Sequence, residues 1–239
     1  MKVHVYLRNL GIASRRKGEE MIREGRVLVD GKPAIIGQQV VGNEQIQVDG
    51  RVVITTEQKT QYRYLMLNKP RGFTSTTATH FRNEQSLLEL LPSSLRSIPW
   101  QIVGRLDKES QGLVLLTTDG GLGFALTHPK FEIRKIYQVT TSRALTEEEM
   151  RLLQGGVLGQ SGEWYRFYSI KRLSREQYEC ILTEGKKREI REALAVFGVS
   201  VTQLQRVGLG TLRIGNLPEG SYRELTLGEI AQLKAESEN

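Results

Sequence analysis

The sequence predicts a two-domain protein of the α+β class, in which a small front unit precedes a larger unit built on a mixed, mainly antiparallel sheet. Expected strands outnumber expected helices, without the regular strand–helix alternation of a doubly wound sheet. A polar stretch, TTEQKTQ at residues 55–61, separates the two units. The length of 239 residues allows each unit to bury a core. We therefore place the domains at residues 1–58 and 62–239.

The front unit is expected to hold two helices and two hairpins. A short helix is expected near Val3 to Leu10, and Ser14 is a suitable N-cap for a second helix that ends at Gly25. Asp30-Gly31 and Asp49-Gly50 each lie between short apolar runs, and such dipeptides suit the positive φ angles of tight hairpins. These elements form either a structural cap with solvated charges or a binding unit.

The larger unit begins with a strand in YRYLMLNK that runs into a turn at residues 69–72, where Pro70 cannot continue a ladder. Further strands are expected at Leu113–Thr117, Lys135–Thr141, Trp164–Lys171 and Gln177–Thr183. Helices are expected at Gln85–Leu91, Gly121–Leu126, Thr146–Gln154 and Lys186–Phe197. The tail, Lys234–Asn239, is expected to be frayed.

Composition limits the class of function. The chain has 34 Lys and Arg against 27 Asp and Glu, a net charge of +7, which favours nucleic acid as partner over an anionic membrane surface. Its apolar runs are too short to span a bilayer and its N-terminus lacks a signal-peptide pattern, so we expect a cytoplasmic protein. Cys180 is the single cysteine and the three histidines are far apart, so no metal site is expected. No nucleotide-binding glycine loop is present, and no cofactor is expected.

The order of elements in the front unit resembles the S4-type RNA-binding domain, on the residues GIASRRKGEEMIREGRVLVDGKP. In that family the basic helix start and the loop near the hairpin contact RNA phosphates, as the free N–H groups of a helix start would favour. The resemblance implies RNA-binding roles for Arg15, Arg16 and Lys17, followed by Arg26 and Lys32.

Four segments of the larger unit resemble the pseudouridine synthases of the RsuA/RluB/RluF branch, which modify ribosomal RNA. In order they are LNKPRG, GRLDKESQGLVLLTTDG, KIYQV and ILTEGKKREIREAL. Without the resemblance, Asp107 in the second segment would be interpreted as a turn or capping residue. With it, Asp107 matches the essential aspartate of the family, which acts on the ribose of the target uridine. Attack on C1′ and removal of a C2′ proton are both compatible with the sequence.

The same resemblance implies roles for six other residues. Either role of Asp107 needs an ionised carboxylate, and Arg191 matches the family's partner cation. On pattern alone, the arginines of this segment would be a solvated helix face. Tyr137 is expected to lie against the uracil, although a strand tyrosine also packs on a sheet. The other expected substrate-binding residues are Ile190 as an apolar wall, Lys69 in loop structure or phosphate contact, Arg105 at the RNA backbone, and Arg188.

Where relatives carry Gln and then two arginines, this chain has Glu189, and after Arg191 it has Glu192 and Ala193, so the RNA contacts of this motif are expected to differ. The whole pattern predicts a monomeric, cofactor-independent enzyme that isomerises one uridine of ribosomal RNA, within an assembling subunit. The ending RVGLGTLRIGNLPEGSYRELT favours the large subunit. The alternative is a catalytically inactive RNA-binding factor of ribosome assembly.

Overall fold

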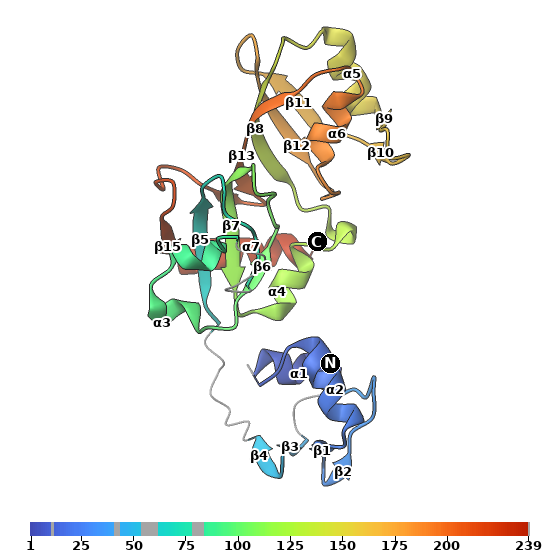
Figure 1. The fold of residues 1–239 in the computed structure, drawn as a ribbon, viewed down its shortest axis with the longest axis vertical. Helices are drawn as coiled ribbons and strands as arrows, with labels where there is room; N and C mark the ends of the chain where they lie inside the picture. The colour runs from blue at the N-terminus through green and yellow to red at the C-terminus, as the bar shows by residue number, and fades with distance from the viewer. Residues whose placement is uncertain (11, 41–43, 54–61, 78–83, 239) are drawn as a thin grey trace. The chain divides into compact units, whose positions relative to one another are not determined.

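A computed structural model describes residues 1–10, 12–40, 44–53, 62–77 and 84–238. The chain divides into two compact units, Met1–Tyr62 and Arg63–Asn239, each with its own core (Figure 1). The polar stretch at residues 55–61 lies outside the described residues. Within the described part of the chain, no helix combines the length and apolar character needed to cross a membrane.

The front unit consists of two helices and a small antiparallel sheet. Its elements are α1 (Val3–Asn9), α2 (Arg15–Arg23), β1 (Val27–Val29), β2 (Lys32–Pro33), β3 (Ile46–Val48) and β4 (Arg51–Val53), with the strand order β2-β1-β3-β4. Asp30, Gly31, Asp49 and Gly50 all have positive φ, which confirms both expected hairpins. The side chain of Ser14 accepts a hydrogen bond from the Lys17 backbone N–H at 3.2 Å, so Ser14 is the N-cap of α2.

The second unit is built on a nine-stranded mixed sheet, counted over the described residues. Its strands are β5 (Tyr64–Lys69), β6 (Gln101–Val103), β7 (Gln111–Thr117), β8 (Lys135–Thr141), β11 (Ser169–Arg172), β12 (Gln177–Leu182), β13 (Val201–Leu209), β14 (Leu212–Arg213) and β15 (Tyr222–Glu224). The order is β11-β12-β8-β13-β7-β5-β15, with β14 on β13 and β6 on β7. Only the β13–β7 pair among these is parallel, which agrees with the expected mainly antiparallel sheet.

Helices cover both faces of this sheet, which explains the uninterrupted apolar runs of β5 and β7. Leu65 and Leu67 of β5 join one core cluster, whereas Tyr64 and Met66 join the other. The helical elements are η1 (Leu87–Leu90), α3 (Ser93–Arg96), α4 (Gly120–Ala125), η2 (Pro129–Phe131), α5 (Glu147–Gly155), α6 (Glu189–Ala195) and α7 (Leu227–Glu238). Figure 1 shows α5 and α6 beside β11 and β12, and α4 and α7 beside β5, β6 and β7.

Several expected elements differ from the structure. The strand expected at Trp164–Lys171 is two strands, β10 (Trp164–Tyr165) and β11, because β10 pairs with β9 (Val157–Leu158) in a separate hairpin. Residues 234–238 of the tail expected to fray belong to α7, whose Leu233 is fully buried in the core, and Asn239 lies outside the described residues. The helix expected at Gln85–Leu91 is a single 3-10 turn, and α6 begins three residues later than expected, at Glu189. The long central strand β13 was not expected.

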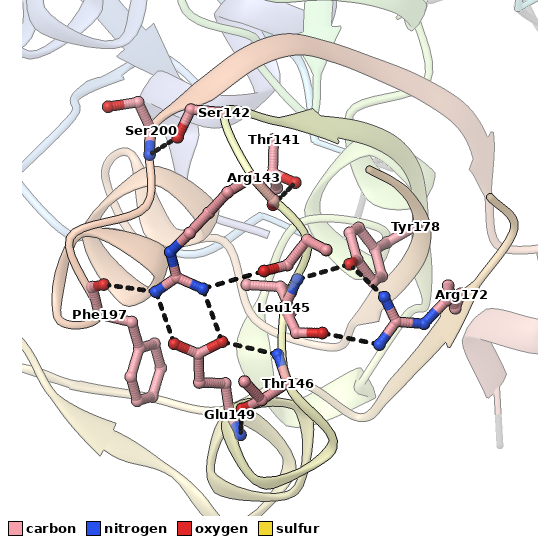
Figure 2. Close-up of polar contacts among 11 residues, drawn as sticks. Thr141, Ser142, Arg143, Leu145, Thr146, Glu149, Arg172, Tyr178, Phe197 and Ser200 are labelled. Atoms are coloured by element: carbon pink, nitrogen blue, oxygen red, sulfur yellow. Dashed lines mark hydrogen bonds and ion pairs between the residues drawn. The ribbon is translucent and has the colours of Figure 1, made fainter. Parts of the chain in front are cut away.

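An arginine beside the N-terminus of α5 links this helix to α6. Thr146 and Glu149 form a capping box at the start of α5, and Arg143 holds Glu149 through hydrogen bonds of 2.6 and 3.0 Å (Figure 2). The same guanidinium donates to the backbone carbonyl of Phe197, just beyond α6, at 2.8 Å. These hydrogen bonds from Arg143 lower the pKa of Glu149 to about 2. The arrangement fixes the end of the helix that carries Ile190.

The sequence pattern of this cap, R-x-L-T-x-x-E, occurs a second time before α7. There Arg223 donates to Glu229 at 2.6 and 2.9 Å, and Glu229 accepts from the backbone N–H of Thr226 at 2.9 Å. Again the arginine lowers the pKa of the glutamate to about 2. The same capping arrangement therefore starts a helix on each face of the sheet.

Candidate active site

Asp107 lies in a loop between the antiparallel strands β6 and β7, and we call residues 104–110 the Asp107 loop. Two buried cations hold the ends of this loop. The Nζ of Lys69, which has no exposed surface, donates to the carbonyl of Ser110 at 2.6 Å. Arg206 is 1% exposed, and its guanidinium donates to the carbonyl of Gly104 and, at 2.7 Å, to that of Leu113. Both charges therefore serve the loop through its backbone.

Two further contacts secure the middle of the Asp107 loop. The hydroxyl of Ser75 donates to the carbonyl of Leu106 at 2.8 Å and accepts from its N–H at 3.0 Å. Arg71 donates to the carbonyl of Glu109 at 2.9 Å. The turn after β5 and the Asp107 loop are thus bonded to each other along their length, which restricts the position of Asp107.

The glycine after this loop allows a close backbone approach. Gly112 has a φ of +111°, and a Cβ at this position would lie 2.3 Å from the backbone oxygen of Arg206. Gly112 and Arg206 are partners in the parallel β7–β13 pair. Only a residue without a side chain fits there, which is why glycine follows the GRLD segment before the apolar run.

A cleft of about 850 Å³ opens beside the Asp107 loop. It is lined by segments far apart in the sequence: the Asp107 loop, β8, β13, and the residues leading into α6. Five of the residues predicted from sequence line it, namely Arg105, Asp107, Tyr137, Arg188 and Ile190. The basic residues of its lining outnumber the acidic ones; they are Arg105, Lys108, Lys135, Lys186, Lys187, Arg188 and Arg206, against Glu84, Asp107 and Glu189.

The carboxylate of Asp107 is partly exposed at this cleft. Across the described ranges, no cation forms an ion pair with it within 4.0 Å. The apolar lining of the cleft includes Tyr137 on β8, which is 8% exposed, and Ile190 on α6, which is 3% exposed. Both side chains also belong to the larger core cluster, so their positions are fixed by packing. The cleft thus combines an unpaired carboxylate with a rigid aromatic and aliphatic wall.

Arg191, the residue after Ile190 on α6, does not line the cleft. Its Nη1 donates to the carbonyl of Val201 at 2.8 Å, while Nε and Nη2 are buried and have no hydrogen-bond partner in the described part of the chain. Burial and the neighbouring Arg188 lower the pKa of Arg191, against the opposing effect of Glu109 and Asp107. Arg191 therefore contributes a positive field toward Asp107 without contact.

Two buried lysines add to the charge around the cleft. Burial lowers the pKa of Lys69 to about 8, although Asp107 and Glu109 act to raise it. Burial, and then the charge of Arg206, lowers the pKa of Lys135 to about 8, and its Nζ donates to the carbonyls of Ile133 and Thr183 at 3.0 and 3.1 Å. Lys69 does not line the cleft, and its Nζ donates to the backbone carbonyls of Pro70 and Ser110.

The backbone enters α6 through an unusual conformation. Arg188, the N-cap residue, has a φ of +53°, a backbone angle that residues other than glycine rarely adopt. Its guanidinium lies 3.6 Å from the carboxylate of Glu109 and 3.9 Å from that of Glu192. The next residue, Glu189, is 5% exposed; its Oε2 accepts from the backbone N–H of Lys186 at 2.9 Å, and burial raises its pKa. Glu192 thus faces Arg188.

The predicted RNA-binding residues of the front unit fall into two groups. Arg15, Arg16 and Lys32 are exposed. Lys17 is exposed too and forms an ion pair with Glu20 at 3.0 Å. Arg26 is held by Asp49 through hydrogen bonds of 2.6 and 2.8 Å and by Glu24 at 2.9 Å, so acids of its own unit already neutralise its charge. The side chains of Arg26, Glu24 and Asp49 are each more than a third exposed, so these ion pairs are open to solvent.

Among the cleft residues that the sequence did not predict are two buried cations, Lys135 and Arg206. Lys135 stands two positions before Tyr137 in the segment that identified the tyrosine, and Arg206 begins the segment RVGLG. A basic residue within a strand of otherwise apolar inward positions is a signal for a buried cation, because such a charge needs backbone acceptors. In the described part of the chain, no group of three His, Cys, Asp or Glu side chains could hold a metal ion.

Comparison with known proteins agrees with this geometry. Residues 63–196 match a family model described as RNA pseudouridylate synthase, and residues 1–46 match the S4 domain. An RNA pseudouridine synthase of Aquifex aeolicus is 35% identical over 98% of this chain and 96% of that protein. The ribosomal large subunit pseudouridine synthase B of Bacillus subtilis is 33% identical, over 94% of this chain and 92% of its own length. The corresponding enzyme of Pseudomonas aeruginosa is 36% identical, and the chain spans 62% of its length. A crystal structure of a pseudouridylate synthase superposes with a TM-score of 0.71 and 25% identity, covering 98% of this chain and 99% of that one.

Proposed function

Because the chain belongs to the family of RNA pseudouridylate synthases, we propose that it isomerises a specific uridine of ribosomal RNA, with the large subunit favoured. The chain is an isomerase that acts on RNA, and its front unit is an S4 domain. The relatives named for the large subunit support the choice of substrate. We further propose that the enzyme acts as a monomer in the cytoplasm and meets its RNA within an assembling subunit.

The observation that carries this function is the convergence of Asp107, Tyr137 and Ile190 on one cleft. The reaction breaks the bond between N1 of uracil and C1′ of ribose, and forms a bond between C5 and C1′. A uridine must leave its stack to reach the carboxylate, so the substrate is an unpaired nucleotide in a loop or bulge. Asp107 then acts on the ribose, by attack on C1′ or by removal of the C2′ proton.

Tyr137 and Ile190 would hold the detached base between an aromatic and an aliphatic surface. Such contacts offset part of the stacking that the base loses, about 1 to 3 kcal/mol per base in single-strand binding. Because both side chains are packed into the core, the base can rotate without the wall moving. Arg105 and Arg188 line the cleft and would meet RNA phosphates, whereas Arg191 and Lys69 do not line it and would act on Asp107 through their charge alone.

The experiment is chemical mapping of pseudouridine in both ribosomal RNAs of cells that carry the wild-type chain, Asp107→Asn or Glu148→Gln at equal abundance. Asp107→Asn should lose one modified uridine, with a rate at least about 10³-fold lower in the purified enzyme, because the attacking or accepting carboxylate is gone. Glu148→Gln makes the same charge change on the exposed face of α5 and should behave as wild type.

The alternative of an inactive assembly factor predicts a different result. Such a protein would leave the maps of wild type and Asp107→Asn identical, while both bind RNA equally. A carboxylate in a cleft lined mainly by basic residues favours catalysis over this alternative, because a site that only binds phosphates gains nothing from a negative charge.

A further inference from the structure

The two tryptophans of the chain lie in opposite environments. Trp100 is 5% exposed and its indole N–H donates to the carbonyl of Leu95 at 2.8 Å. Trp164 is 62% exposed, and Leu158, its partner across the β9–β10 hairpin, is 54% exposed. An exposed tryptophan beside an exposed leucine forms an apolar surface that packing within this unit does not explain.

The hairpin that presents Trp164 is firmly anchored. The next residue, Tyr165, is 1% exposed and belongs to the larger core cluster. A Cβ at Gly159 would lie 2.4 Å from the ring of Tyr165, and a Cβ at Gly156 would lie 3.4 Å from the ring of Trp164. The indole therefore rests along the backbone at Gly156 and is held in place on that side.

Trp164 is joined to the cleft by the segment that leads into α6. Lys186 lines the cleft, and its Nζ donates to the carbonyl of Trp164 at 2.6 Å. Lys187 also lines the cleft and is exposed. The backbone of Trp164 is thus bonded to a residue that lines the cleft, although Trp164 itself does not line it.

The basic residues that contact Trp164 or lie near it in the sequence indicate the kind of partner that would cover the indole. Lys186 is paired with Glu184 at 2.7 Å, but Lys187 forms no ion pair with any residue that the structure describes. Arg166, two residues after Trp164, is exposed and uses its Nε to reach the carbonyl of Gln154. An exposed indole whose backbone carbonyl is held by one lysine of the cleft, with the exposed Lys187 next in the chain, matches the surfaces on which proteins stack single-stranded nucleic acid, where a ring meets a base and cations meet phosphates.

We infer that Trp164 is a stacking platform for an unpaired base of the substrate RNA near the target uridine, with Lys187 at the adjoining phosphate. This inference rests on the proposed function, since it extends the RNA path from the Asp107 cleft to the β9–β10 hairpin. The base on Trp164 would be one that flanks the flipped uridine, and stacking there would offset part of the cost of opening the RNA.

The test uses the full chain and an RNA fragment that spans the mapped uridine, with Kd and the single-turnover rate at saturating RNA measured for each variant. Trp164→Ala should raise Kd about 10-fold, whereas Trp164→Phe should raise it less than about threefold, because a smaller ring still stacks. Replacing flanking nucleotides one at a time by abasic sites should identify one position where Trp164→Ala has no further effect, as expected for two groups in contact. Leu227→Ser removes an exposed apolar side chain at the start of α7, outside this surface, and should bind RNA as wild type does.

An unchanged Kd for Trp164→Ala would overturn the inference and assign this surface to a protein partner. The inference would also be overturned if Trp164→Ala raised Kd by the same factor with every abasic RNA, since no single base would then stack on the indole. Failure of the proposed function is a separate result, because wild-type enzyme would then bind RNA without forming pseudouridine, while the Kd values would still report on Trp164. Thermal unfolding checks that each variant is folded, and an exposed position predicts little change.

Discussion

The two units use their cations in opposite ways. In the second unit, Lys69, Lys135 and Arg206 are buried, and backbone carbonyls accept their hydrogen bonds. In the S4 domain, Arg15 and Arg16 are exposed at the start of α2. The first group holds the ends of the Asp107 loop and the backbone beside β8 and β12, whereas the second leaves its charge open to solvent, where we propose that it meets RNA.

Buried and exposed cations should therefore respond differently to salt. Interactions between exposed charges are screened over about 8 Å at physiological ionic strength, whereas buried charges are screened much less. Cations that meet phosphates in solution make binding depend on salt, because they release counterions. We therefore expect salt to change the RNA affinity contributed by the S4 domain and to leave the arrangement of the Asp107 loop unaltered.

The largest effect is expected when a buried cation is removed. Arg206→Met would leave the carbonyls of Gly104 and Leu113 without their donor, so the free energy of unfolding should fall by about 3 to 5 kcal/mol. The variant should also modify RNA more slowly under conditions where it is folded, because Gly104 begins the Asp107 loop. Urea unfolding and single-turnover rates measure the two effects.

Arg151→Met is the matched control for this substitution. Arg151 is exposed on α5, so the same change should alter the free energy of unfolding by less than about 0.5 kcal/mol. Equal losses in the two variants would show that burial does not distinguish the cations of the second unit. Arg206→Lys should fall between wild type and Arg206→Met, since one ammonium can reach only part of the same acceptors.

The sequence predicted the exposed cations better than the buried ones. Ser14 and the basic first turn of α2 follow from local capping signals, and the two Asp-Gly hairpins from local turn chemistry. Arg206 could not be assigned in this way, because its acceptors lie in β7 and in the Asp107 loop, about a hundred residues away in the chain. The strand β13, which carries Arg206, was missed for a different reason. Its pairing with β8 is irregular near Val201 and near Arg206, which interrupts the alternation of a regular strand.

The next effect in size concerns the S4 domain. Replacing Arg15, Arg16 and Lys17 together by Gln should reduce the salt dependence of RNA binding, lowering the slope of log K against log salt by about 2. The rate at saturating RNA should stay that of wild type, since none of the three lies in the unit that carries Asp107. Filter-binding titrations across a salt series measure the slope. A lower rate at saturating RNA, together with an unchanged salt slope, would show that these residues act in catalysis and not in RNA binding.

The smallest effect is expected at Arg26, which the sequence groups with the docking residues but which two acids already hold. Arg26→Gln should change the Kd for RNA by less than about twofold, whereas Arg16→Gln should raise it by about three- to fivefold, because only the second removes charge that phosphates can reach. Binding at one fixed low salt concentration compares the two directly. An equal loss of RNA affinity in both variants would mean that Arg26 exchanges its ion pairs with Asp49 and Glu24 for RNA phosphates. Ion pairs within the free domain would then not determine which surface cations bind RNA.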